Sequence, residues 1–63
     1  MYTVIFKRKD KKPDEIYYYE DIAEAKYHFE LFKNDDSDLY IRIELWREQK
    51  SIKMLIDSIK FNL

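Results

Sequence analysis

The 63-residue sequence contains no cysteine and no glycine, and it has a single proline. Without cysteine there can be no disulfide and no thiolate metal site. Without glycine, the glycine-rich loops that bind phosphates and dinucleotides are excluded as well. No apolar run approaches the ~18 residues of a membrane span, and no signal-peptide pattern begins the chain. We therefore expect a soluble cytoplasmic protein with no membrane association.

We predict one domain over residues 1–63, because so short a chain has no room for a second core. A chain of this size buries only about 60% of its unfolded surface, so packing or association must replace the missing disulfides. Aromatic residues, at 17% of the sequence, supply the large buried area that packing needs. The net charge of −1 conceals a strong segregation of charge: +4 over residues 1–13, −7 over 14–38 and +2 over 39–63.

The first third of the chain has the pattern of a β-hairpin. Residues 2–7 alternate between two faces, which is typical of a half-buried strand. Residues 9–15 are polar and contain the proline, which predicts a turn. Ile16–Tyr19 is short, aromatic and β-prone, which predicts the returning strand.

A helix should follow, starting at a capping box in which Asp21 accepts from the amide of Glu24. It should run to about Lys33 and end with Asn34 in a left-handed cap. One helical face is broad and aromatic, and we predict that it packs on Val4, Phe6, Ile41 and Ile43 of the sheet. This face consists of Ile22, Ala25, Phe29 and Phe32.

The last third of the chain predicts a second hairpin. Leu39–Trp46 alternates, with the odd-numbered residues facing the core, and Arg47–Lys50 is the predicted turn. A four-residue loop would pair Leu45 with Ile52, Ile43 with Met54 and Ile41 with Ile56, and would set Glu44 opposite Lys53. Beyond Asp57 the alternation changes phase. A bulge near Asp57–Ser58 would turn Ile59, Phe61 and Leu63 inward.

Hairpin, helix and hairpin in this order predict an α+β fold, a two-layer ββαββ roll of the ubiquitin or protein G type. One helix packs on a four-stranded mixed sheet, with the first and last strands as parallel neighbours in the order 2-1-4-3. The alternative is a βαββ fold that lacks the Ile16–Tyr19 strand. In either case one face of the sheet has no helix to cover it.

The opening YTVIFK, the segment YEDIAEAKYHFELF and the strand DLYIRIEL resemble small proteins of Gram-positive bacteria and of their phages or mobile elements. The resemblance covers most of the chain and lies in fold-forming residues. It implies an origin in a phage or mobile element, and it implies no activity.

No residue pattern indicates catalysis, so we predict no enzyme, cofactor, metal or small-molecule substrate. The single histidine, His28, lies at the border of the core face, where Glu24 could orient it, but no nucleophile accompanies it. Asp35, Asp36 and Asp38 lack the glycine and the terminal glutamate of a calcium loop.

Three surfaces are candidates for binding. The uncovered sheet face should carry aromatic, aliphatic and charged residues of the kind found at interaction hot spots, with Ile5 and either Tyr17 or Tyr19 nearby. Its predicted site consists of Tyr40, Arg42, Glu44, Trp46 and Leu55. A second, narrower surface is the solvent side of the helix, formed by Ala23, Tyr27 and Leu31. A third is the basic tip of the first hairpin, which could contact phosphates through Lys7, Arg8, Lys9, Lys11 and Lys12.

From these surfaces we predict a non-enzymatic protein-interaction module, with a homodimer or a partner site centred on Trp46 and not on Tyr27. One alternative is a phage-encoded inhibitor that docks on a host defence or replication protein through the acidic helix side. Another is a weak nucleic-acid binder using residues 7–12, which ranks lower because the sequence pI of about 5.8 is acidic.

Overall fold

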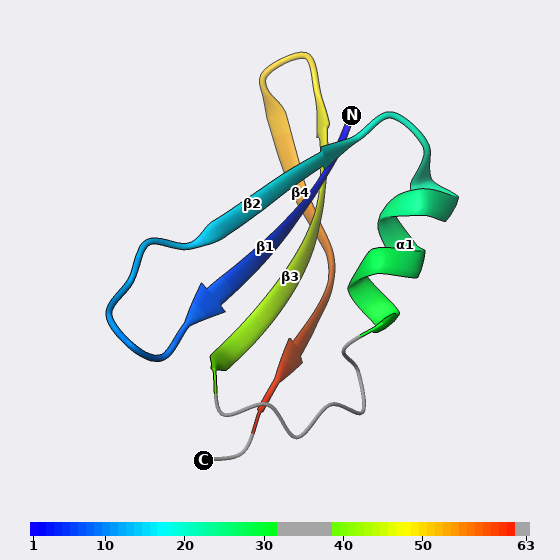
Figure 1. Ribbon diagram of the computed structural model, residues 1–63. Coiled ribbons are helices and arrows are strands. Elements are labelled where there is room, and N and C mark those ends of the chain that lie inside the picture. Colours follow the sequence, from blue (N-terminus) through cyan, green and yellow to red (C-terminus); the bar gives the residue numbers. More distant parts are fainter. Residues whose placement is uncertain (32–38, 62–63) are drawn as a thin grey trace.

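The computed structural model describes residues 1–31 and 39–61. One helix packs on one face of a four-stranded sheet (Figure 1), so the predicted small α+β class is confirmed. The strand at Glu15–Tyr19 forms, and the three-stranded alternative is therefore wrong. The elements are β1 (Tyr2–Arg8), β2 (Glu15–Tyr19), α1 (Ile22–Leu31), β3 (Tyr40–Gln49) and β4 (Ile52–Lys60).

The strands lie in the order β2-β1-β3-β4, and each neighbouring pair is antiparallel. The predicted mixed sheet of the ubiquitin type, with β1 parallel to β4 at its centre, is wrong. Because β1 is antiparallel to both neighbours, β2 and β3 run parallel to each other on either side of it, and α1 crosses between them. The two central strands are β1 and β3, and Ile43 and Leu45 of β3 are fully buried. By contrast, β4 is an exposed edge strand.

The helix begins as its sequence predicts. Asp21 caps the first turn, with its Oδ1 accepting a 3.0 Å hydrogen bond from the amide of Ala23, one position earlier than predicted. The predicted helix end at Lys33 and the cap at Asn34 lie outside the described residues.

The core between α1 and the sheet contains most of the predicted residues. Its buried apolar side chains are Val4, Phe6, Ala25, Phe29, Tyr40, Ile43 and Leu45. The prediction was wrong for Ile22 and Ile41, which are exposed, while Phe32 lies outside the described residues. Ile22 is the first residue of α1. Ile41 falls where the β1–β3 register shifts: Lys7 pairs with Arg42 and Arg8 with Tyr40, which leaves Ile41 as an extra residue.

The turn of the second hairpin is shorter than predicted. Both strands continue to a two-residue turn at Lys50 and Ser51, which have φ values of 49° and 73°. Two successive positive φ angles are what a type I′ hairpin turn requires, because its twist matches that of the strands. The predicted pairing of Leu45 with Ile52 is therefore wrong, and Ile52 pairs with Gln49 instead.

A bulge in β4 restores the inward phase of the C-terminal residues, one position earlier than predicted. Leu45 pairs with Asp57 and Trp46 with Leu55, so Ile56 is the extra residue. Ile59 then lies opposite Ile43, and both Ile59 and Phe61 pack against the core as expected. Leu63 lies outside the described residues.

The beginning of β4 is exposed on both faces. Ile52, Met54 and Ile56 were predicted to be buried, but each is exposed. The turn of the β3–β4 hairpin extends past the start of β1 and past α1 (Figure 1), and α1 packs over β1, β3 and β2. Apolar residues at this end of the hairpin therefore lie beyond the part of the sheet that α1 covers.

Candidate functional site

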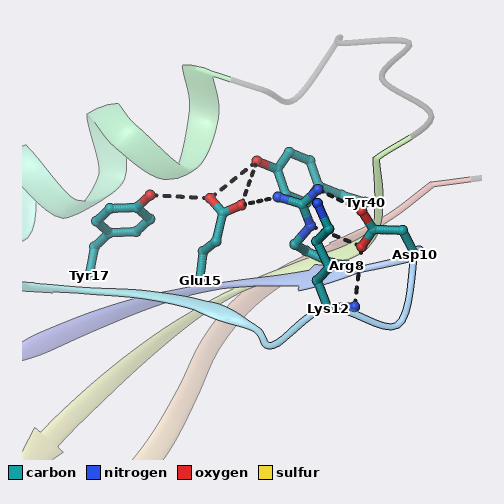
Figure 2. Close-up of polar contacts among 6 residues, drawn as sticks. All are labelled: Arg8, Asp10, Lys12, Glu15, Tyr17 and Tyr40. Atoms are coloured by element: carbon teal, nitrogen blue, oxygen red, sulfur yellow. Dashed lines mark hydrogen bonds and ion pairs between the residues drawn. The ribbon is translucent and has the colours of Figure 1, made fainter.

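A network of charged and aromatic side chains ties the first hairpin to the start of β3 (Figure 2). Its centre is the carboxylate of Glu15, on which Tyr17 and Tyr40 converge from opposite sides, donating hydrogen bonds of 3.1 Å and 3.2 Å. Arg8 contacts the same carboxylate through Nη1 at 2.7 Å and binds Asp10 through Nε and Nη2. The residues come from β1, the turn, β2 and β3, so the network holds three strands together.

The charged side chains of this network, Arg8, Asp10 and Glu15, stay ionised at neutral pH. Hydrogen bonds from Arg8 lower the pKa of Asp10 to about 2 and also lower the pKa of Glu15, while Asp10 and Glu15 together raise the pKa of Arg8. Partial burial raises the pKa of Tyr17 and of Tyr40. Each of these shifts moves the group away from neutral pH, where general acid–base catalysis operates.

The ion pairs also remove part of the basic tip from the candidate phosphate contacts. Arg8 is held by Asp10 and Glu15, and Lys7 pairs with Asp14 at 3.4 Å. Lys9, Lys11 and Lys12 remain exposed at the turn. Two of the five predicted basic side chains, Lys7 and Arg8, are thus paired with acids, which weakens the attraction of the cluster for phosphates.

The structure places four of the five predicted interaction residues together on the sheet face opposite α1. Arg42, Glu44, Trp46 and Leu55 lie there, as the alternation of β3 and its pairing with β4 require. The prediction was wrong for Tyr40, which is buried on the helix side against Phe6. The extra residue Ile41 reverses the alternation at this end of β3, so Tyr40 points to the face opposite the one predicted.

Glu44 lies at the centre of the cluster of Arg42, Trp46 and Leu55 on the sheet face opposite α1, which we call the open face. Although it lies on the face opposite α1, Glu44 is only 6% exposed. It accepts a 3.0 Å hydrogen bond from Nε1 of Trp46 and forms an ion pair with Nη1 of Arg42 at 3.3 Å. Both partners are two residues away on the same strand, so they share its face and their side chains are fixed by one carboxylate.

A shallow hollow of ≈ 340 Å³ lies beside this cluster. The lining includes Ile16 and Tyr18 of β2, which were not among the predicted site residues. In a short run of consecutive tyrosines, the sequence does not show which side chains face outward. Pairing with β1 decides it: Tyr17 and Tyr19 lie opposite Val4 and Tyr2 on the helix side, which corrects the prediction that one of them neighbours Trp46. The hollow is lined by Thr3, Ile5, Lys7, Ile16, Tyr18, Glu44, Trp46, Glu48 and Lys53.

The predicted helix stripe also comes together, and it forms one wall of a groove. Tyr27 is 71% exposed and Leu31 57% exposed, with Ala23 one turn before Tyr27. An open groove of ≈ 520 Å³ runs along this side of α1. Its lining is mainly apolar and consists of Tyr19, Ala23, Glu24, Tyr27, His28 and Leu31.

His28 joins this groove to the sheet. Its ring lies 5.0 Å from that of Phe6 and 4.8 Å from that of Tyr17, and its Nδ1 shares a hydrogen bond with the hydroxyl of Tyr19. The orienting partner is therefore Tyr19 and not the predicted Glu24. Burial lowers the pKa of His28, with a weaker opposing effect of Glu15, so the imidazole is neutral at pH 7.

Within residues 1–31 and 39–61, no group of three histidine, aspartate or glutamate side chains is placed to hold a metal ion. Over the same residues, no helix is long and apolar enough to cross a membrane. No protein-family model matches the chain, and neither a curated protein nor a solved structure matches it.

Proposed function

We propose that this chain is a non-enzymatic protein-interaction module that binds a protein partner, or a second copy of itself, through the open sheet face around Trp46. The observation that carries the proposal is the buried carboxylate of Glu44, which holds Trp46 and Arg42 in place on the sheet face opposite α1. Tryptophan and arginine are the residue types most enriched at interaction hot spots.

Prior fixing of these side chains favours binding. An immobilised side chain loses little further freedom when a partner arrives, and that saving is typically about 0.5–1.5 kcal/mol for each side chain. The side chain of Arg42 remains 35% exposed, so it is accessible to a carboxylate of the partner. Leu55 and Tyr18, both exposed, extend the apolar area on either side of Trp46.

The proposal is tested first by sedimentation equilibrium at rising protein concentration. We expect association that is lost in Leu55→Glu, which places a charge on the open face at an exposed position of the edge strand, and in Trp46→Ala. Tyr27→Ala, on the other side of the molecule, is the matched control and should associate like the parent. Circular dichroism of each variant checks that the fold is retained.

If the chain stays monomeric, the same variants are compared for capture of a partner from cells that express the protein. Capture should then depend on Trp46 and Leu55. A strict monomer whose partner binding ignores Trp46 but is lost with Tyr27→Ala would refute the assignment and make the helix side the binding surface.

A second candidate function is inhibition of a host defence or replication protein by docking of the acidic helix side. It is favoured by the groove along α1, where exposed Tyr27 and Leu31 lie near Glu24. Nucleic-acid binding by the hairpin tip ranks below both, because Lys7 and Arg8 are already paired with acids of the same hairpin.

A further inference from the structure

The outer edge of β2 is suited to accept another strand. Among the described residues β2 pairs only with β1, so the backbone groups along its other side have no partner in the sheet. Its pairing with β1 runs through five residues without a bulge. The opposite edge, β4, is protected by the bulge at Ile56 and by the charges of Lys53, Asp57 and Lys60.

The groove along α1 lies beside the end of this free edge. Tyr19 of β2 forms one side, and Tyr27 and Leu31 of α1 form the other. The contacts of His28 with Tyr17 and Tyr19 brace α1 against β2, so the groove is formed before anything binds. A five-residue strand is ~17 Å long, so a segment of about five residues can pair along β2 and reach the groove at Tyr19, the residue of β2 that lines it.

Charge selects the kind of segment. Residues 14–31 contain six acidic residues and one lysine, a net charge of −5. Lys7 pairs with Asp14 and Arg8 with Glu15, but Glu20 and Asp21 remain at the entrance to α1, with Glu24 in the groove wall and Glu30 further along the helix. A second copy that paired with β2 in the parallel direction would bring the same acids to this edge, and like charges would repel it. A basic segment is attracted instead.

We propose that the groove between α1 and the free edge of β2 binds an extended segment of a partner protein as a fifth strand. The segment is apolar at alternate positions, where side chains enter the groove beside Tyr27 and Leu31, and carries lysine or arginine at its ends. Backbone hydrogen bonds to β2 supply affinity and the groove supplies side-chain specificity, as in other complexes formed by strand addition. The inference rests on the proposed protein-binding function but uses a surface distinct from that of Trp46.

The test measures fluorescence anisotropy with a labelled probe peptide, Lys-Val-Thr-Val-Thr-Val-Lys. We expect saturable binding that Leu31→Ser and Tyr27→Ser each weaken by about tenfold or more. Both residues are largely exposed, so neither change should disturb the core. The matched control is Ile52→Ser, an equally exposed apolar residue on the opposite edge strand, which should bind within about twofold of the parent.

Two altered peptides separate strand addition from plain hydrophobic capture. Methylation of alternate backbone nitrogens removes donors that a new strand needs, and glutamate in place of the terminal lysines reverses the charge. Each should weaken binding about tenfold or more. Equal binding of the methylated peptide, or no saturable binding up to about 1 mM peptide, would overturn the inference.

The outcome also separates this inference from the proposed function. Peptide binding that is lost with Trp46→Ala and kept in Leu31→Ser would assign the peptide to the open face, overturning the groove and supporting the Trp46 site. Dimerisation that depends on Trp46, together with no peptide binding, would refute the proposed peptide site in the groove and leave the proposed Trp46 site supported.

Discussion

Replacing Phe29 by alanine tests which face of α1 supports the fold. Phe29 is 2% exposed and packs in the core with Val4, Phe6 and Ile43. Truncation of a buried phenylalanine typically costs about 3–5 kcal/mol, because the surrounding core only partly closes the cavity. At about 0.05–0.15 kcal/mol per residue, a chain of 63 residues has a total stability of only about 3–9 kcal/mol.

The variant should therefore lose at least about a third of its stability, and all of it if the parent lies at the low end of this range. At about 4–8 °C per kcal/mol for a domain of this size, a loss of about 4 kcal/mol lowers the Tm by roughly 15–30 °C. Thermal and urea unfolding followed by circular dichroism measure the change. Tyr27→Ala is the control, because this side chain is 71% exposed on the opposite side of the same helix and its loss should cost less than about 0.5 kcal/mol. A Phe29→Ala protein that melts like the parent, or a larger loss for Tyr27→Ala, would show that the two faces are assigned the wrong way round.

Two further predictions concern polar groups. Glu44→Ala should lower the free energy of unfolding by about 1–2 kcal/mol, because the indole of Trp46 and the guanidinium of Arg42 lose their common partner. It should also shift the fluorescence emission of Trp46, the only tryptophan, to the red. Glu44→Gln, which keeps an acceptor, should change the emission less. An unchanged spectrum in Glu44→Ala would contradict this role of Glu44. The second prediction is a loss of stability as the pH falls below about 6.5, the ordinary pKa of an unfolded histidine. Burial lowers the pKa of His28 in the folded state. The unfolded chain therefore binds the proton more readily, and acid favours unfolding. The lowered pKa values of Asp10 and Glu15 act separately, with their stabilisation lost below about pH 4. Unfolding measured from pH 7 to pH 5 should show a smaller slope in His28→Gln than in the parent, and equal slopes would be evidence against the prediction.

Local patterns in the sequence were sufficient for the elements and for much of the core. Alternation over residues 2–7 predicted β1, aromatic β-prone residues predicted β2, and Asp21 predicted the start of α1. The period of 3.6 residues placed Ala25 and Phe29 on the buried side of the helix. These features depend on neighbours within a few positions in the chain, so a single sequence contains the information that determines them.

The candidate surfaces were predicted to a similar depth. Arg42, Glu44 and Trp46 alternate on one strand and share a face wherever that strand lies in the sheet. Ala23, Tyr27 and Leu31 share a helical face for the same reason. The alternation did not reveal that Glu44 would be buried, nor that Tyr19 and His28 would complete the groove, because both depend on which strands become neighbours.

The strand order, the register of β4 and the position of Tyr40 were decided only by the tertiary structure. The turn at Lys50 and Ser51 has two positive φ angles without the glycine or asparagine that usually announces them, so the sequence offered no sign of the longer hairpin. The extra residue Ile41 reverses the alternation of β3, which moved Tyr40 to the core. The bulge that turns Ile59 inward was predicted, but the strand pairing places it at Ile56. All three features are fixed by pairing between strands that are distant in sequence. This pairing depends on how the whole sheet and the helix bury apolar area together, so the alternation within one strand cannot predict it.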